Sequence, residues 1–504
     1  MLSRHHILSI LVITSMLSTP AFAAEFTDLA DAADDFDDLV DETFDGFDFI
    51  LEPNLIAEFG SAVVTREGVC VPSASDLVGA AATDFEANNP RLSIDPERCA
   101  EPQIIDNLET QVDSTKLTLD FALKFGLYKD LQFQIRVPYV LIDSHKYRYA
   151  DGVDEANSSI APSSARISAD SSANFSTYKF FDLSSTTTEY KRSGFSDPTI
   201  GLAWAPFNDE RDDTKATLLI GMDYRMPISP VRRAGNDSVG EGMHELHWKV
   251  ASSKKFDWIE PYFGLQYYLP LAATDSPILD VDPANSGQVF KQAPQRGDIT
   301  IGTEFIPFEE PLKGIKYTFD VQFRFGYTSD GRDYSPLFDA FANNSCNGKR
   351  LSEVQAGGAS PECGWIAQQP SNAPLRGGKP NPLYDLSNAQ SDPSFNFDGI
   401  TTTESYGSFA GKIGFTAQPS KYFQLRGGVS LTHHQDHFIT NARTGKDLDN
   451  NLEESPDSTV DLSGADAEKE KNPVFNPTYD GNGSRFRVQS FNVWTASVSA
   501  ALKF

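Results

Sequence analysis

The chain has 504 residues and a formal charge of −29, from 71 acidic and 42 basic residues. This acidic balance argues against a nucleic-acid-binding protein, which needs a concentrated basic surface. No apolar stretch after residue 23 approaches the roughly 20 residues of a membrane-spanning helix, which excludes a helical membrane protein. A β-barrel fits this composition, because its strands need only about 9 to 11 residues and face lipid with alternate side chains.

The N-terminus has the three parts of an export signal. Basic residues at positions 4–6 precede the apolar run 7–17, and Ala21 and Ala23 are small residues at the two positions that a signal peptidase reads. Residues 1–23 are therefore predicted to be a removed signal peptide. The alternative is a short buried N-terminal helix.

Residues 24–46 form an acidic segment without lysine or arginine. Its apolar residues repeat at spacings of three and four, which is typical of one helical stripe. The stripe consists of Phe26, Leu29, Ala33, Phe36 and Val40. We expect a periplasmic amphipathic helix that packs under the barrel mouth or pairs with a second copy; the alternative is a solvated acidic linker.

The stretch "TKLTLDFALKFGLYKDLQFQIRVPYVL", residues 115–141, places an apolar side chain at every second position. The alternation pauses only at Lys129 and Asp130. A period of two belongs to a strand with two different faces, not to a helix. The stretch therefore predicts a hairpin that is apolar on one face and polar on the other.

The same alternation recurs along the chain in about twelve runs. They cover residues 47–59, 117–127, 131–141, 200–204, 218–224, 246–250, 259–269, 299–305, 317–327, 409–415, 423–431 and 494–504. An even number of such strands predicts one all-β domain over residues 47–504, a single antiparallel up-and-down transmembrane β-barrel. The alternative is a soluble secreted β-sandwich, whose strands average about five or six residues.

The connections between these runs alternate between long and short. Long polar segments are predicted at 67–113, 143–194, 230–242, 272–296, 329–400 and 439–484, and short turns at 129–130, 207–214, 257–258, 308–314 and 418–421. Long extracellular loops opposite short periplasmic turns are the asymmetry of outer-membrane barrels. Both chain termini then lie on the periplasmic side.

The four cysteines fall into two close pairs inside predicted extracellular loops. Spacing favours disulfides between Cys70 and Cys99 and between Cys346 and Cys363, although four cysteines allow three connectivities. The alternative, a zinc site, would more commonly show C-x-x-C spacing, which does not occur. We expect neither a metal nor a cofactor.

The side chains on the polar face of the strands are expected to lie in the lumen. Candidates for a solute path are Asp120, Lys124, Arg136, Asp223, Arg225, Glu245, Lys249, Asp320, Arg324, Lys412 and Arg426. Both signs of charge are mixed, whereas a simple ion filter shows one dominant sign. Two interpretations stay open: a polar path between opposed charges, or a closed barrel cross-braced by salt bridges.

Two other kinds of site have little support in the sequence. His433, His434 and His437 could bind a metal, but neighbouring residues of a strand face opposite ways. A barrel phospholipase needs a His-x-Ser pair on one strand, so that the imidazole can activate the hydroxyl, and the sequence has no such pair. We predict that the protein is not an enzyme.

Two stretches resemble a known family. "FGLYKDLQFQIRVPYVL", residues 125–141, and "SGFSDPTIGLAWAPF", residues 193–207, are similar to outer-membrane barrels grouped as the MetA-pathway of phenol degradation family. The resemblance rests on Gly126, Asp130, Pro138, Gly194, Asp197 and Gly201. It covers about a quarter of the chain, and Ser196 stands where the family more often has glycine. The resemblance implies a channel for small, often aromatic or hydrophobic compounds, without catalytic residues.

These residues also have structural roles that follow from their chemistry. Gly201 leaves space for a neighbouring bulky side chain, and Pro138, which lacks a ladder donor, is expected near a strand end or a bulge. Asp197 precedes Pro198, which favours an extended backbone at the start of its strand.

The sequence as a whole predicts a monomeric channel or transporter in the outer membrane of a Gram-negative bacterium. Its expected partners are outer-membrane lipid and lipopolysaccharide, a small-molecule solute, and the barrel-assembly machinery, which would recognise the terminal strand ending at Phe504. The alternative is a non-conducting surface barrel whose disulfide-closed loops bind partners.

Overall fold

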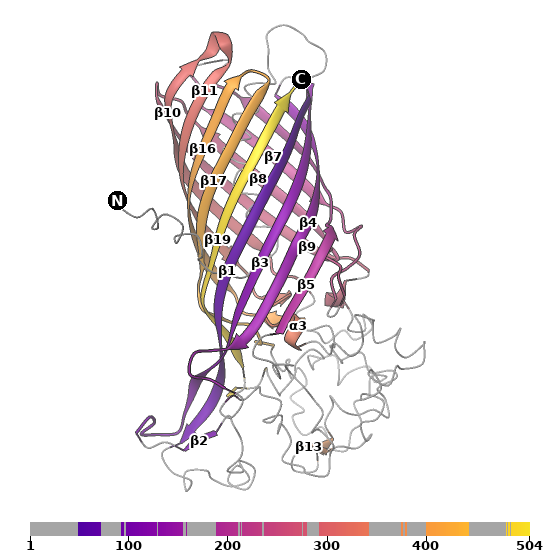
Figure 1. The fold of residues 1–504 in the computed structure, drawn as a ribbon, viewed down its shortest axis with the longest axis vertical. Coiled ribbons are helices and arrows are strands. Elements are labelled where there is room, and N and C mark those ends of the chain that lie inside the picture. Colours follow the sequence, from indigo (N-terminus) through magenta and orange to yellow (C-terminus); the bar gives the residue numbers. More distant parts are fainter. Residues whose placement is uncertain are drawn as a thin grey trace, which may run out of the picture.

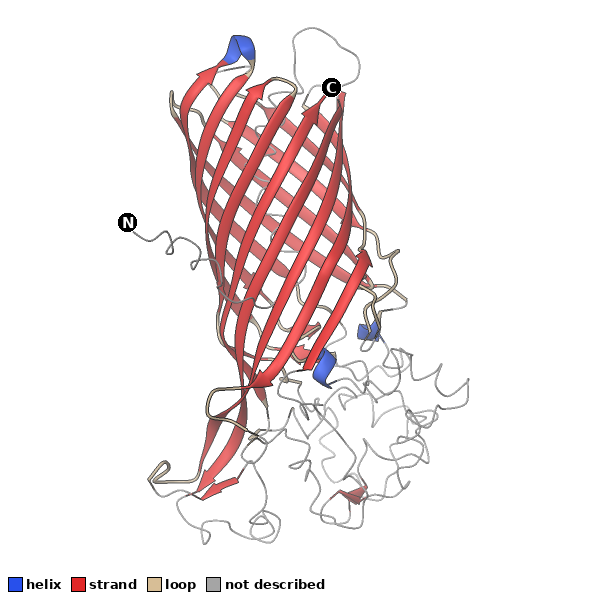
Figure 2. Cartoon of the chain, in the orientation of Figure 1, coloured by secondary structure: helices blue, strands red, loops and turns tan. Residues whose placement is uncertain are grey.

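A closed antiparallel sheet forms the body of the protein (Figure 1, Figure 2). This computed structural model describes residues 49–71, 92–94, 97–128, 130–154, 158, 188–209, 212, 214–233, 236–274, 276–279, 292–341, 374–375, 379–380, 400–442, 480, 482–483 and 485–504. The twelve barrel strands within them are β1 (Phe49–Val71), β3 (Gln103–Tyr128), β4 (Leu131–Tyr149), β6 (Thr199–Phe207), β7 (Thr217–Arg225), β8 (Met243–Ser253), β9 (Ile259–Ala272), β10 (Arg296–Glu310), β11 (Ile315–Thr328), β16 (Tyr406–Ser420), β17 (Phe423–His434) and β19 (Phe486–Lys503). The predicted fold class is confirmed.

Shorter elements complete the described residues. They are β2 (Leu92–Ile94), β5 (Thr188–Phe195), η4 (Pro277–Leu279), η5 (Pro311–Lys313), β12 (Gly331–Asp333), α3 (Phe338–Phe341), β13 (Pro374–Leu375), β14 (Lys379–Pro380), β15 (Thr401–Thr403) and β18 (His437–Phe438). The short turns and the C-terminus lie at one end of the barrel, here called the turn end, and α3 lies at the opposite end, the loop end (Figure 1).

In the part of the chain that the structure describes, no helix is long and apolar enough to cross a lipid bilayer.

The first and last strands close the sheet. β1 pairs with β19 from Ile50 opposite Lys503 to Arg66 opposite Phe486. At the turn end the backbone N–H of Phe504 donates to the carbonyl of Phe49 over 3.1 Å, and the two rings stack with centroids 4.7 Å apart. Closure leaves neither of these strands with an unpaired edge, which a barrel in lipid requires.

Each strand has two faces, as the alternation predicts. Phe121 is 41% exposed while Asp120 beside it is 4% exposed, and Phe323 is 52% exposed beside Arg324 at 4%. The apolar side chains thus point outward and the polar ones inward. The alternative, a two-layer sandwich, is excluded, because the strands form one closed sheet whose apolar face is outside.

Three of the predicted turns contain, among their described residues, one with a left-handed backbone. Asp130 has a φ of 55° between β3 and β4, Asp257 has a φ of 49° between β8 and β9, and Gly314 has a φ of 62° after η5. Asp tolerates this conformation better than most residues, and Gly has no Cβ to oppose it. At Gly314 a Cβ would also lie 2.9 Å from the backbone nitrogen of Lys421. Both the backbone conformation and the lack of space therefore favour glycine at this position.

Several strands extend into segments that were predicted to be loops. β3 begins at Gln103 rather than near 114, β4 ends at Tyr149, and β19 begins at Phe486 rather than at 494. In these extensions outward positions form ion pairs, such as Arg487 with Asp106 at 2.9 Å. The alternation is lost there because residues beyond the bilayer have water, not lipid, on the outer face.

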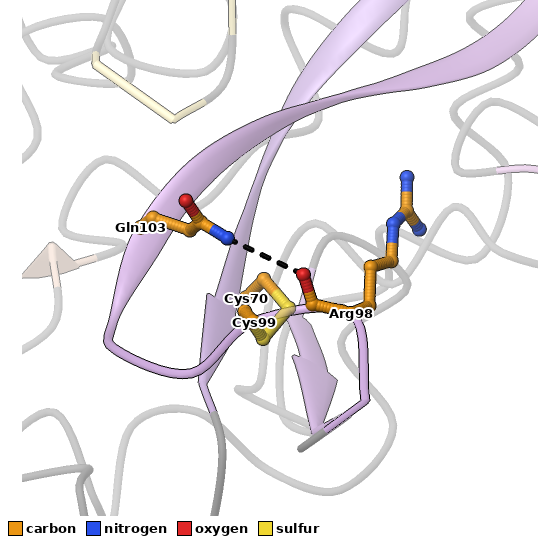
Figure 3. The surroundings of a disulfide bond; sticks show 4 residues. All are labelled: Cys70, Arg98, Cys99 and Gln103. Carbon is orange, nitrogen blue, oxygen red and sulfur yellow. Dashed lines mark hydrogen bonds between the residues drawn. A yellow bond between two sulfur atoms is a disulfide. The ribbon is translucent and has the colours of Figure 1, made fainter.

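The ends of β1 and β3 form an arm at the loop end that carries the predicted disulfide. Cys70 is bonded to Cys99, and beside it the amide of Gln103 donates to the carbonyl of Arg98 over 3.5 Å (Figure 3). β2 adds to this arm in parallel to the end of β1. The second predicted pair, Cys346 with Cys363, lies outside the described residues.

The predicted N-terminal segments also lie outside the described residues. The signal peptide at 1–23 and the acidic helix at 24–46 precede the first described residue, Phe49. Both stay predictions.

The bilayer around the apolar face can be tested on one strand. Phe121→Lys places a charge at the centre of the outward run of β3, and it should lower the free energy of unfolding from lipid vesicles by about 2–4 kcal/mol. Ile104→Lys is the matched control, because Ile104 is 49% exposed on the same strand but lies in the arm. Its effect should be near zero, and equal small effects of both changes would contradict a lipid-facing belt.

Candidate functional site

The eleven side chains predicted for the lumen all point into the barrel. Nine are buried, and Arg136 and Arg225 are partly buried. Three groups of interactions between neighbouring strands contain most of them. Their role as a solute path stays a prediction.

At the turn end, Glu52 of β1 joins two cations. Its carboxylate lies 2.9 Å from Nζ of Lys124 on β3 and 3.2 Å from the guanidinium of Arg426 on β17. A buried carboxylate needs such partners, because desolvation of an unpaired charge is expensive. This group therefore braces the wall on both sides of the closing seam.

In the middle of the wall, Asp223 of β7 collects three partners. Nζ of Lys249 lies 3.0 Å away, Nδ1 of His247 lies 3.3 Å away, and the amide of Gln134 donates to Oδ1 over 2.7 Å. The His247 ring also stacks on Tyr268, with centroids 4.1 Å apart. The ammonium of Lys249 and the amide of Gln134 are donors to the carboxylate, so this buried carboxylate is well satisfied.

Nearer the loop end, arginines and acids alternate around the wall. Arg225 contacts Glu241 at 2.6 Å and Glu245 at 3.3 Å. Arg296 contacts Glu245 from the other side, and Arg136 contacts Asp120 at 2.9 Å.

These side chains surround a cavity of about 120 Å³. Its lining includes the charged side chains of Arg136, Arg225 and Glu241. Apolar side chains also line it, namely Ile56, Pro138, Val140 and Val239. The interior is thus cross-braced and still holds a cavity, so both interpretations of the charge pattern describe part of it.

Beside the cavity the wall changes character at an interrupted strand. β4 pairs with β6 up to Arg136 and with β5 from Tyr139, so residues 196–198 separate two pieces of one barrel strand. Pro138 lies opposite this break, where a ladder donor is not needed. Among the described strands β5 pairs only with β4. Its other side meets loop residues 226–242, where Ser193 N–H donates to Asp237 over 3.4 Å.

Asp197 holds that loop against the break. Its carboxylate is buried and accepts hydrogen bonds from the backbone N–H of Ser229 at 3.0 Å and of Glu241 at 2.9 Å. The sequence predicted only an extended backbone before Pro198. The side chain does more, because it places Glu241 where its own carboxylate faces the cavity.

Residues 331–341, here called the mouth segment, are fastened to the barrel wall by buried charges. Asp339 of α3 accepts two hydrogen bonds from Arg192 of β5, one of them over 2.9 Å. His145 lies between Asp339 at 3.6 Å and Asp143 at 3.1 Å. Arg232 of the loop completes the chain at 3.0 Å from Asp143.

The mouth segment also packs into two apolar clusters on opposite sides of the barrel. Leu337 is fully buried in a cluster that includes Val112 of β3 and Phe486 of β19. Phe338 is 2% exposed and packs in a cluster with Met243 of β8. Because β8 and β19 lie far apart around the barrel, the mouth segment contacts distant parts of the wall at the loop end.

Two carboxyl groups of the mouth segment have pKa values shifted in opposite directions. Burial raises the pKa of Asp333 to about 6, although the backbone N–H of Tyr334 donates to it over 2.7 Å. Burial acts in the same direction on Asp339, but the hydrogen bonds from Arg192 and His145 outweigh it and lower that pKa to about 2. The mouth segment therefore favours a protonated Asp333 and an ionised Asp339.

The candidate histidines at the end of β17 do not form one site. His433 contacts Asn492 at 3.0 Å on the outer face, His434 stacks on Phe491, and the His437 ring stacks on Tyr406. No group of three potential metal ligands was found within the described residues.

The sequence did not reveal the residues of the mouth. Arg192, Arg232, Glu241 and Asp339 fall in segments that were predicted to be loops, where period-two alternation carries no signal. The only sequence feature near them is the Asp143-Ser-His145 spacing, which puts both polar side chains on one face of a strand.

The sequence matches no family model, and it matches no curated protein. Several solved structures share the general shape. They include an outer membrane channel of Pseudomonas putida F1 described as COG4313, with 8% identity, a TM-score of 0.31 and coverage of 90% of this chain and 95% of that one. A Pseudomonas aeruginosa FadL homologue has 9% identity, a TM-score of 0.30 and coverage of 91% and 90%. The outer membrane protease OmpT of Escherichia coli has 7% identity, a TM-score of 0.25 and coverage of 92% and 99%. Likenesses this weak support no argument about family or function.

The ion pair at α3 can be tested by hydrogen exchange. Asp339→Asn removes the carboxylate partner of the buried Arg192, which costs about 3–5 kcal/mol, so amides of the mouth segment should exchange about 100-fold to 1,000-fold faster or more. Lys191→Gln is the control, because Lys191 pairs with Glu189 on the exposed side of the same strand. Such surface pairs contribute little, so exchange should stay unchanged.

The raised pKa of Asp333 predicts an effect of pH. A carboxyl with a raised folded-state pKa stabilises the folded mouth below its unfolded pKa, and this contribution is lost as pH rises through about 6. Asp333→Asn mimics the protonated form, so at pH 7 it should slow exchange of the mouth segment relative to the wild type. The difference should shrink as pH falls and vanish only below the ordinary Asp pKa of 3.8, and equal rates at pH 7 would contradict the assignment.

Proposed function

We propose that the protein is an outer-membrane channel or transporter for small molecules. The observation that supports this best is the cavity inside a closed barrel whose exterior is apolar. A solute there would meet both charged pairs and the apolar side chains of Ile56, Val140 and Val239. Such a surface suits small compounds with both an apolar body and a hydrogen-bonding group.

The apolar exterior of the barrel supports a position in a membrane. Outward side chains such as Phe319 and Ile413 are 49% and 67% exposed, and a soluble protein rarely shows so continuous an apolar surface. We place the barrel in a Gram-negative outer membrane, as a monomer in contact with lipid and lipopolysaccharide. The terminal Phe504, stacked on Phe49, suits recognition by the barrel-assembly machinery.

The proposal does not include catalysis. His145 lies on the inner face two residues from Asp143, a spacing that suits an acid and a histidine acting together. However, Asp143 and Asp339 face its two ring nitrogens, and the mouth segment covers it. An imidazole held in this way is poorly placed to activate a nucleophile for a substrate.

A second candidate is a surface barrel without throughput. The mouth segment across the loop end and the disulfide-bonded arm favour it. Recordings from planar bilayers separate the two, using the wild type and Asp339→Asn. Discrete conductance steps in either protein support a channel, and silence in both supports the surface barrel.

Charge reversal tests which residues line the path. Arg136→Glu adds negative charge at the cavity, so the reversal potential in a salt gradient should shift toward cations. Lys146→Glu is the matched control, because Lys146 is on the same strand but outward-facing and its side chain is 45% exposed. A shift of equal size in the control would contradict the lumenal position of Arg136.

A further inference from the structure

Several inward-facing glycines of the barrel wall lie beneath a long polar side chain of a neighbouring strand. They are Gly201 of β6, Gly221 of β7, Gly302 of β10 and Gly326 of β11. In each case a Cβ on the glycine would collide with side-chain atoms of the neighbour. Among these four glycines, the sequence predicted such a role only for Gly201; it predicted the same role for Gly126.

At Gly201 two side chains meet above the glycine. The register places Gln134 of β4 and Asp223 of β7 directly on either side of it. The amide of Gln134 donates to the Asp223 carboxylate over 2.7 Å, crossing β6 to do so. A Cβ at 201 would lie 2.7 Å from the amide nitrogen and closer still to the carboxylate. The hydrogen bond therefore occupies the volume that any other residue would fill.

The next strand repeats the arrangement for the same carboxylate. Lys249 of β8 lies opposite Gly221, and its Cγ and Cε would each be 2.8 Å from a Cβ there. Its Nζ reaches back to Asp223 at 3.0 Å. The whole lysine side chain thus lies along the wall instead of extending toward the barrel axis.

Gly302 and Gly326, on another part of the barrel wall, also lie beneath polar side chains. The Tyr262 hydroxyl passes over Gly302 and donates to Asp320 of β11 over 2.7 Å. Asp298 and Ser408 approach each other above Gly326 from the two adjacent strands.

The physical effect is to keep side chains out of the lumen. A glycine in a strand interior costs about 0.5–1 kcal/mol relative to alanine, so it needs a compensating gain. Here the gain is a layer of polar groups that lie parallel to the wall and satisfy one another. A larger residue at 201 or 221 would push flexible ends, the carboxylate, the amide or the lysine stem, inward toward the axis.

We propose that Gly201 and Gly221 are specificity-determining residues that set the width of the lumen at the level of Asp223. This inference rests on the proposed channel function and adds the residues that limit solute size. Asp223 lines the cavity. A larger residue at 201 or 221 would therefore narrow the lumen at the side of the cavity that faces the turn end.

Gly201→Ala tests the inference by conductance. The colliding atoms are side-chain ends that can rotate, so the variant should fold, as heat-dependent migration of the barrel in a gel would show. Single-channel conductance should fall by about twofold or more, and neutral polyethylene glycols of smaller mass should be excluded. Gly221→Ala should act in the same direction.

Gly427→Ala is the matched control. Gly427 lies in a strand of the same barrel, but a Cβ there would meet nothing closer than a backbone oxygen at 3.8 Å. It carries the same change of backbone freedom without a displaced side chain. Conductance and polymer exclusion should match those of the wild type.

A second measurement does not depend on throughput. Thr199 lines the cavity on the strand of Gly201, two residues nearer the loop end, so Thr199→Cys reports access from the turn end. With purified barrels, the ratio of labelling rates for a bulky and a small maleimide should fall by about tenfold when Gly201→Ala is added. The protein without Thr199→Cys gives the background from the native cysteines.

The outcomes separate the inference from the proposed function. If the wild type conducts but Gly201→Ala alters neither conductance nor the labelling ratio, the inference is wrong and the channel stands. If both proteins are silent but the labelling ratio falls, the glycines set the width of a barrel that is not a channel. If no maleimide reaches position 199 in either protein, the lumen is closed at this level and the inference fails.

Discussion

The hydrogen-bonded seam between β1 and β19 is the constraint on which the rest of the structure depends. It converts a ribbon of strands into a closed wall, so that the seam leaves no backbone edge unpaired toward lipid. Once the wall is closed, every strand must place one face outside and one inside. The apolar exterior and the polar interior are both consequences of that geometry.

The interior then has to satisfy many charges in a small volume. A buried ion is expensive unless paired, and the barrel places partners on strands that are adjacent or separated by one strand. Glu52, Asp223 and Glu245 each have two or more cationic or neutral partners on such strands. Pairing along the wall leaves a cavity, because glycines in the wall accept the side chains that would otherwise cross the lumen.

The loop end follows a different principle from the wall. There, chain segments outside the barrel strands enter the interior and bring their own charges, Asp339 and Arg232, to residues of β4 and β5. Apolar packing at Leu337 and Phe338 adds to these pairs. The mouth segment is therefore attached by contacts that can be broken without disturbing the twelve-strand ladder. At the break in the interrupted strand, the Asp197 carboxylate holds the following loop through the backbone N–H groups of Ser229 and Glu241.

The sequence by itself determined the barrel, its twelve strands, the turn at Asp130 and the inward residues from Asp120 to Arg426, because period-two alternation is local and survives in a single chain. It also identified Cys70 with Cys99, whose separation is short. The predicted strand ends were wrong where the outer face of a strand is hydrated. There the alternation is absent, although β3 and β4 continue. Only the tertiary structure decided which charges pair, that Arg192 meets Asp339 across 147 residues, and that Gly201 lies beneath Gln134 and Asp223. Those contacts depend on the register between strands and on the path of loops over a closed wall, and neither quantity is encoded in the spacing of residues along one strand.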